Sequence, residues 1–357
     1  DEVRYEYYFN EDATWEAFKK GGQYDYRNEN RAQRWAEQYN FPAVQRGDVV
    51  KKSFPFNAVG RMQGYFLNTR KDKFKDPKVR EALTYAFDFE SMNRLLFFNQ
   101  YTRINSYFAG NELQLSGAPT PEETAILETV KDALPAEALT EEFKLPVYDT
   151  PQATRDNLRK ALQLFGEAGW KLQGNKLVDA KGNQFTIEFL GKDPTDERIY
   201  NTFAASLRKI GINATVRIVD TAQYQARVND FDYDVITSVT AQTASPGNEQ
   251  RDMWGSKAAD FKGRRHYAGI KNPAIDKLID RIIYAKDREE LVAASHALDR
   301  ALLWNYYVIP QWYSDHINVA YWNKFSMPEE QPEYMGIDPF SWWIDPAKET
   351  KIKTGAE

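Results

Sequence analysis

The chain has 357 residues, with 47 basic and 52 acidic side chains and a formal net charge of -5. This length suits about two compact domains of roughly 150 residues each, and the mildly negative charge argues against a dedicated nucleic-acid binder, which needs a basic face. The absence of cysteine excludes thiolate metal sites, disulfides and cysteine nucleophiles. No apolar run is long enough to predict a membrane span, and no signal peptide is visible at the start.

The first part of the chain alternates predicted strands and helices. Strands are expected over residues 3–9, 49–56 and 64–68, and short or amphipathic helices over 14–20, from Pro77 onward, and over 91–98. Pro77 occupies the first turn of its helix, where the missing N–H costs no hydrogen bond. Residues 110–150 are rich in proline, glutamate and threonine and predict a surface excursion.

Regular structure resumes after this excursion. The pattern predicts a helix over 155–168, a hairpin around 174–175, a strand over 184–190, a helix over 196–210, and strands over 213–219 and 234–239. The strand–helix–strand order favours parallel pairing with a right-handed crossover. Two helices over 273–285 and 288–304 and a tyrosine- and tryptophan-rich strand region over 308–321 complete an α/β chain. Strands that enclose a long α/β body are typical of a two-lobed clamp.

No catalytic motif is present. The three histidines do not form the HExxH spacing of a zinc protease, and GxSxG, Walker and GxGxxG patterns are missing. His296 falls within a helical pattern and is expected to be structural or exposed. A pair of carboxylates of the glycosidase kind stays possible among 52 acidic residues, but nothing singles one out. We therefore expect no enzyme activity and no cofactor.

Several segments, in this order, resemble the family 5 solute-binding proteins, the dipeptide and oligopeptide receptors of ABC importers. They are 65–69 (YFLNT), 74–88 (FKDPKVREALTYAFD), 231–235 (FDYDV), 272–279 (NPAIDKLI) and 308–310 (VIP). Within the family, 101–108 (YTRINSYF), 111–113 (NEL) and 245–252 (SPGNEQRD) resemble the YejA-type receptors of short peptides and of the peptide-nucleotide antibiotic microcin C.

The resemblance implies a two-lobed periplasmic binding protein of type II, similar to cluster C. Residues 1–67 and 314–357 are then expected in lobe I, and 68–313 in lobe II. Members of the family have an additional N-terminal portion, so lobe I is expected to be incomplete in this chain, with unpaired strand edges. That portion, on the same or another chain, is one expected partner, and the inner-membrane permease subunits are another.

The resemblance also implies a periplasmic receptor that binds short peptides or peptide-like compounds in a cleft between the lobes. Such a receptor pairs with the ligand main chain as an added strand. The segment in the family's position for this is Val239, Thr240, Ala241, Gln242 and Thr243. A plain sheet edge followed by a loop is the structural alternative.

Further candidates for ligand contact follow this segment or lie near the first crossover. Oligopeptide receptors often have an aspartate for the ligand's amino group where this chain has Thr243, so Glu249 is the expected substitute. Arg251 offers a planar guanidinium fork to a carboxylate or phosphate, and Asn248 is a candidate in the same run. The structural alternative is a loop whose polar side chains bond only to one another. Trp254 is expected to stack on a ligand or to cap the core, and Arg103 and Tyr107 to line the cleft.

Two alternatives to a peptide receptor remain open at this point. The same fold is compatible with a non-peptide ligand, such as an oligosaccharide, a nickel chelate or an opine-like compound. A secreted hydrolase that uses a carboxylate pair belongs to a different class, and turnover of glycosides or esters would reveal it. Three histidines and no cysteine make a direct metal site a poor expectation.

Overall fold

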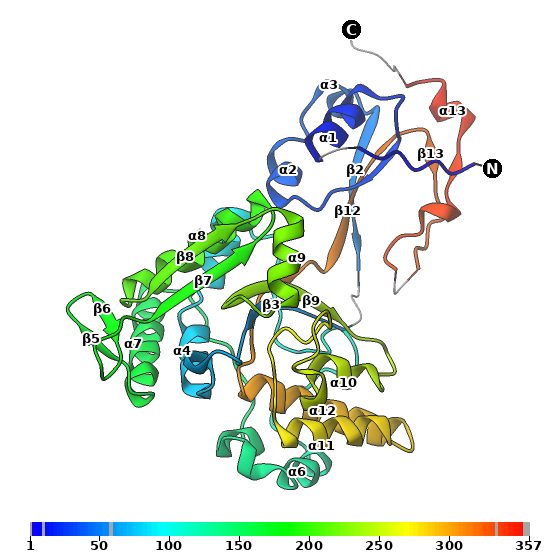
Figure 1. Ribbon diagram of the computed structural model, residues 1–357. Helices are drawn as coiled ribbons and strands as arrows, with labels where there is room; N and C mark the ends of the chain where they lie inside the picture. Colours follow the sequence, from blue (N-terminus) through cyan, green and yellow to red (C-terminus); the bar gives the residue numbers. More distant parts are fainter. Residues whose placement is uncertain (1, 9–10, 57–59, 333–334, 353–357) are drawn as a thin grey trace. The chain divides into compact units, whose positions relative to one another are not determined.

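The computed structural model describes residues 2–8, 11–56, 60–332 and 335–352. The chain forms two compact units (Figure 1). The smaller unit comprises Asp1–Ala58, Arg94–Thr102 and Ser314–Glu357, and the larger comprises Val59–Asn93 and Arg103–Tyr313.

The smaller unit is built on an antiparallel sheet of three strands. Its order is β1 (Tyr26–Asn28), β12 (His316–Trp322) and β2 (Val49–Pro55), so β12 brings the end of the chain between two early strands. Three helices, α1 (Glu11–Lys20), α2 (Ala32–Glu37) and α3 (Pro42–Gln45), supply an aromatic core for this sheet. Trp322 lies in that core and donates its indole N–H to the Phe18 carbonyl at 3.1 Å.

The rest of the smaller unit consists of short elements. They are the strands β13 (Phe325–Ser326) and β14 (Trp343–Ile344), the 3-10 turn η5 (Pro339–Ser341) and the helix α13 (Pro346–Glu349). Trp342 packs edge-on against Tyr321 at 4.9 Å between ring centroids, which attaches this segment to β12.

The larger unit contains a mixed sheet of five strands. Its order is β10 (Val308–Pro310), β3 (Arg61–Leu67), β9 (Val235–Ala241), β7 (Thr186–Gly191) and β8 (Asn213–Ile218). Strands β7 and β8 are parallel and joined by α8 (Pro194–Lys209), which confirms the expected strand–helix–strand unit. Strand β3 is antiparallel to both of its neighbours.

Helices cover this sheet and extend the unit. They are α4 (Pro77–Tyr85), α5 (Phe89–Phe97), α6 (Pro121–Glu128), α7 (Pro151–Glu167), α9 (Thr221–Asn229), α10 (Glu249–Trp254), α11 (Pro273–Ile283) and α12 (Arg288–Trp304), with α5 continuing into the smaller unit. The hairpin β5 (Lys171–Gln173) and β6 (Lys176–Val178) follows α7, and β4 (Thr102–Arg103) pairs with β11 (Trp312–Tyr313).

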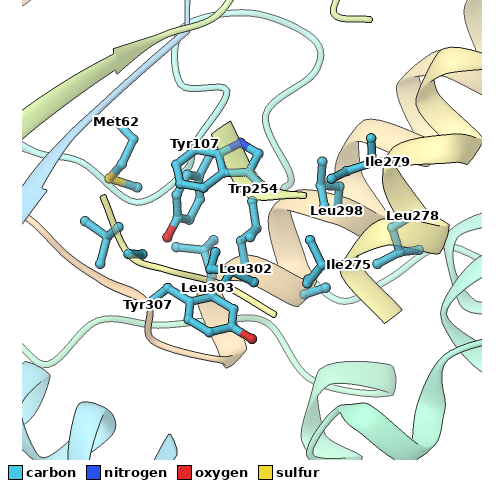
Figure 2. Packing of buried hydrophobic residues seen from close by; sticks show 14 of the residues in the cluster. Met62, Tyr107, Trp254, Ile275, Leu278, Ile279, Leu298, Leu302, Leu303 and Tyr307 are labelled. Atoms are coloured by element: carbon cyan, nitrogen blue, oxygen red, sulfur yellow. The ribbon is translucent and has the colours of Figure 1, made fainter. Parts of the chain in front are cut away.

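The largest core lies where α11 and α12 pack side by side (Figure 1). Figure 2 shows its apolar side chains, with Leu298, Leu302 and Leu303 from α12 close to Ile275 and Leu278 from α11. Leu298 and Leu302 are four positions apart, and Ile275 and Leu278 are three apart, so each pair lies on one stripe of its helix. Packing of the two helices buries both stripes together.

Two sequence expectations need correction. The described residues 3–8 form no strand, while Phe9 lies outside the described residues. The excursion over 110–150 is more than surface, because it contains α6 and buries Leu113 and Leu127 in the main core. Its apolar residues are spaced among prolines and acids, which hid their periodicity.

The compact units also divide the chain differently from the expected lobes. Residues 61–67 form β3, whose hydrogen-bond partners β9 and β10 both lie in the larger unit. Residues 94–102 group with the smaller unit instead. The match between these units and the two lobes of a binding protein stays a prediction.

Candidate functional site

Strand β9 has one fully paired edge and one partly open edge. On one side, β3 pairs with every residue from Val235 to Ala241. On the other side, β7 reaches only Val235 and Ile236. Beyond Ile236, the second edge of β9 has no strand partner among the described residues.

The phase of the ladder shows which main-chain groups face this open edge. Asn68 donates to the Asp234 carbonyl at 3.0 Å, and Gln242 donates to the Gly60 carbonyl at 2.6 Å. The even-numbered residues of β9 therefore bond to β3, and the odd-numbered ones point away from it. Thr237 fits this phase, because its N–H is donated to the Tyr200 hydroxyl at 3.1 Å.

Val239 and Ala241 are the next odd-numbered residues. Their N–H and C=O groups point away from β3, and no hydrogen bond to them occurs among the residues that the structure describes. Val239 is also 44% exposed, which is unusual for an apolar residue near the centre of a sheet. Unpaired main-chain groups in this arrangement are what an added strand bonds to.

The residues that follow are held by contacts within the unit. The Thr240 hydroxyl donates to the Met62 carbonyl at 3.4 Å on the buried side. The buried amides of Gln242 and Gln250 bond to each other, with Gln250 donating to Gln242 at 2.5 Å. Thr243 is exposed, and its hydroxyl oxygen accepts the Ser245 N–H at 3.3 Å.

The expected polar run 248–251 is tied to its own surroundings. Arg251 donates to Asn248 at 2.8 Å and to Asp280 of α11, also at 2.8 Å. The hydrogen bond with Asp280 raises the pKa of the exposed Arg251 guanidinium. Glu249 accepts the Gly247 N–H at 2.7 Å. These contacts fit the self-bonded loop that the sequence left open, and the ligand roles of this run stay predictions.

Trp254 takes the core position that was one of its two expected alternatives, and Tyr107 lies in the same core. Both are fully buried, and their rings meet edge to face at 5.0 Å between centroids (Figure 2). Trp254 also stacks on Phe66, with an interplanar angle of 1°. Each side chain packs on protein over its surface, so neither presents a face to a ligand in this structure.

Arg103 is the first residue of the second segment of the larger unit and lies in β4. Its Nε donates to the Pro310 carbonyl at 3.1 Å, and its guanidinium covers the Phe87 ring at 4.7 Å from the centroid. Both terminal nitrogens are buried and lack a hydrogen-bond partner among the described residues. Burial lowers the pKa of Arg103 to about 10, so the side chain keeps its positive charge at neutral pH.

Several polar side chains that the sequence did not single out accompany β9 on the same face of the sheet. Gln63 donates to Gln311 at 3.2 Å, and Gln311 donates to the Thr237 hydroxyl at 3.1 Å. Tyr200 completes this group through its bond to Thr237. The only sequence signal for them is a polar residue at alternate positions of otherwise apolar strands.

Within the described residues, no cluster of three or more histidine, aspartate or glutamate side chains has the arrangement of a metal site. The same residues include no helix of the length and apolar character that crossing a membrane requires.

Residues 1–262 match the family model described as bacterial extracellular solute-binding proteins, family 5 Middle. A "Probable peptide-binding protein YejA" of Agrobacterium fabrum is 47% identical over 344 residues, which cover 96% of this chain and 56% of that protein. A "Peptidoglycan-binding protein YepA" of the same organism is 37% identical over 350 residues, with coverages of 96% and 57%. The chain thus spans about half the length of these relatives.

Solved structures agree with this match at the level of the fold. The oligopeptide-binding protein AppA from Bacillus subtilis, in complex with a nonapeptide, superposes with a TM-score of 0.65 at 19% identity over 93% of this chain and 58% of that one. NikZ from Campylobacter jejuni, in complex with Ni(L-His), gives 0.64 at 16% identity over 92% and 59%. The expected α/β class of two-lobed periplasmic binding proteins is confirmed.

Proposed function

Because the chain belongs to the bacterial extracellular solute-binding proteins of family 5, we propose that it acts in the substrate-binding component of an ABC importer for short peptides or peptide-like compounds. In this role the protein binds its ligand and hands it to inner-membrane permease subunits, with no catalytic step. The place of action is the periplasm or its equivalent outside the cytoplasmic membrane.

The observation that carries the peptide proposal is the open edge of β9. A peptide presents an N–H and a C=O at each residue whatever its sequence, and Val239 and Ala241 present the complementary pair of groups. Recognition through the main chain accounts for broad specificity. The name of the Agrobacterium relative, a peptide-binding protein, points the same way.

The N-terminal portion typical of longer relatives is the second partner that we propose. The relatives extend well beyond the matched region, and β2 of the smaller unit pairs only with β12 among the described strands. A further strand added to β2 would extend this three-stranded sheet. In this proposal, some of the contacts to a ligand come from that portion.

The decisive experiment is native purification followed by mass spectrometry of whatever the denatured protein releases. Short peptides are expected, whereas oligosaccharides or metal chelates would assign the fold to another ligand class. Thermal shift with a short-peptide library complements this measurement, because a ligand at about a hundred times its dissociation constant adds roughly 2.7 kcal/mol of stability. Peptides methylated on alternate main-chain nitrogens serve as the control, because they lose the donors of an added strand.

A further inference from the structure

We propose that Arg103 binds a carboxylate of the ligand, in a site formed by residues of the larger unit alone. This inference rests on the proposed receptor function and adds a chemical requirement to it. An added strand accounts for the main chain of a peptide, and Arg103 then selects ligands that carry an acidic group at a defined place.

The geometry of the guanidinium carries the proposal. Nε is bonded to the Pro310 carbonyl, so only Nη1 and Nη2 remain for another acceptor. Phe87 covers one face of the group at 4.7 Å, and Phe89 lies further off at 5.6 Å. The plane is thereby fixed by a bond and by stacking, and the two free nitrogens are left side by side. A carboxylate fits such a fork with two parallel hydrogen bonds.

The unpaired donors are costly, which calls for an explanation. Each buried donor without an acceptor costs about as much as the desolvation of that group, and native proteins contain few of them. Arg80 is a buried arginine of the same unit whose donors have acceptors. Its Nε donates to the Asn305 carbonyl at 2.8 Å, and its Nη1 donates to the carbonyls of Phe74 and Lys75 at 2.7 and 2.8 Å. In Arg103, by contrast, both terminal nitrogens are buried without an acceptor among the described residues.

Two acidic side chains lie near Arg103, and neither bonds to it. The electrostatic influence of Glu90 and Asp88 on the arginine is favourable. However, Glu90 accepts the Tyr148 N–H at 3.0 Å, and Asp88 accepts the Ser91 N–H at 2.8 Å. Both carboxylates therefore accept main-chain donors, Glu90 from a distant segment and Asp88 from its own. They help to keep Arg103 charged, and they leave its fork free.

The surroundings of Arg103 connect it to the candidate peptide site. Pro310 pairs with Gly64 of β3, and Gly64 pairs with Ser238 of β9, so Arg103 is anchored two strands away from the open edge. A ligand that pairs with β9 therefore has one charged donor within the same sheet region for its acidic group.

The test compares trialanine with trialanine amide by isothermal titration calorimetry of the purified protein. The wild type is expected to prefer the free acid by roughly tenfold to a hundredfold, which corresponds to the usual strength of charge-assisted hydrogen bonds. Arg103→Met should remove this preference, and Arg103→Lys should restore only part of it, because an ammonium lacks the fork. Equal binding of acid and amide by the wild type would overturn the inference but leave the receptor function standing.

Ligand-free stability gives a second test that does not depend on peptide binding. Arg103→Met removes two unpaired donors together with the Nε bond to Pro310, so the denaturation midpoint should fall less than it does in Arg80→Met. Arg80→Met, or the milder Arg80→Lys, removes satisfied donors and should lower it. If neither peptide binds the wild type, trialanine is not a ligand, and the receptor function is decided by the peptide library. Melting temperatures in sodium acetate and in sodium chloride at equal ionic strength then test Arg103. A rise in melting temperature that is specific to acetate and absent from Arg103→Met supports the site. The absence of such a rise contradicts it, as does a denaturation midpoint that Arg103→Met lowers as much as Arg80→Met does.

Discussion

Two polar regions of the larger unit differ in how completely their groups are paired within the protein. Beneath α12, Asp299 accepts three donors: the Ser106 hydroxyl at 2.5 Å and the N–H groups of Tyr107 and Leu115 at 2.8 and 3.3 Å. Around β9, the main-chain groups of Val239 and Ala241 and the fork of Arg103 have no partner among the described residues.

The difference separates groups that specify the fold from groups that are available to a ligand. Asp299 fixes the loop that carries Ser106 and Tyr107 against α12, and it has little left to offer a partner. The β9 region leaves polar groups unpaired at a cost to stability, as functional sites often do. Substitutions in the two regions should therefore have opposite profiles, with stability lost in the first and ligand binding lost in the second.

The largest effect is expected for Asp299→Ala. The substitution leaves three buried donors without an acceptor, so the free energy of unfolding should fall by about 3–5 kcal/mol. Urea denaturation followed by tryptophan fluorescence measures this loss. If Asp299→Ala unfolds at the wild-type midpoint, the donors find other partners and the contrast between the regions is lost.

A pair of proline substitutions on adjacent residues of β9 tests the contrast within one strand. Thr240→Pro removes an N–H that points toward β3, and it should cost about 3 kcal/mol of stability. Val239→Pro removes an N–H that points to the open edge, so its effect on stability should be smaller, as for prolines on edge strands. Calorimetry with trialanine should show the reverse order, with weaker binding by Val239→Pro.

Equal losses of stability in the two proline variants would contradict the ladder phase that defines the open edge. Retention of full peptide affinity by Val239→Pro would instead exclude its N–H from ligand binding. Val239→Ala is the matched control, because it keeps the N–H and shortens only the exposed side chain.

A smaller effect is expected from pH, through His296. Its Nδ1 lies 2.7 Å from a Glu123 carboxylate oxygen and its Nε2 lies 2.8 Å from the Glu112 carbonyl, so both ring nitrogens face acceptors. Burial lowers the pKa of His296, but the hydrogen bond to Glu123 and the Glu112 carbonyl raise it overall above its ordinary value of 6.5. The protonated form is therefore favoured in the folded protein.

The sign of the pH dependence follows from this shift. The stabilisation is fully present below pH 6.5 and is lost as the pH rises through the higher pKa of the folded state. Asp299 acts in the same direction over a lower range, because burial raises its pKa to about 6. Melting temperatures measured from pH 5 to 8 should fall with rising pH in the wild type. The fall above pH 6.5 should flatten in His296→Gln, and an unchanged slope would exclude His296 as its source.

Much of this fold could be predicted from the sequence, because its helices and strands are marked by signals within short stretches of the chain. Asp76 and Pro77 mark the start of α4, where the Asp76 side chain accepts the Lys78 N–H, and regular apolar spacing marks α11 and α12. The parallel pair β7 and β8 followed from the strand–helix–strand order. The ends of β3 and β9 were placed within a few residues for the same reason.

The candidate site was predictable only in part, because it depends on pairing between distant segments. The segment 239–241 was placed by family resemblance, but the sequence does not reveal that β7 stops pairing at Ile236. Likewise, tryptophan at position 254 suits a core or a ligand equally well, and only the packing against Phe66 and Tyr107 places it in the core. Arg103 is unusual because of what is missing around it, and a sequence records no such absence.

The smallest effect is expected at the surface pair of Arg251 and Asp280. Their contact at 2.8 Å joins two side chains that are each about half exposed, so solvent screening keeps its contribution to stability small. Asp280→Ala should therefore leave the denaturation midpoint nearly unchanged and release the guanidinium of Arg251 from its carboxylate partner. If Arg251 contacts the acidic group of a ligand, this variant should bind trialanine more tightly than the wild type does. Unchanged affinity would indicate that the self-bonded loop is the whole role of Arg251, and it would leave Arg103 as the cation that distinguishes the β9 region from the rest of the unit.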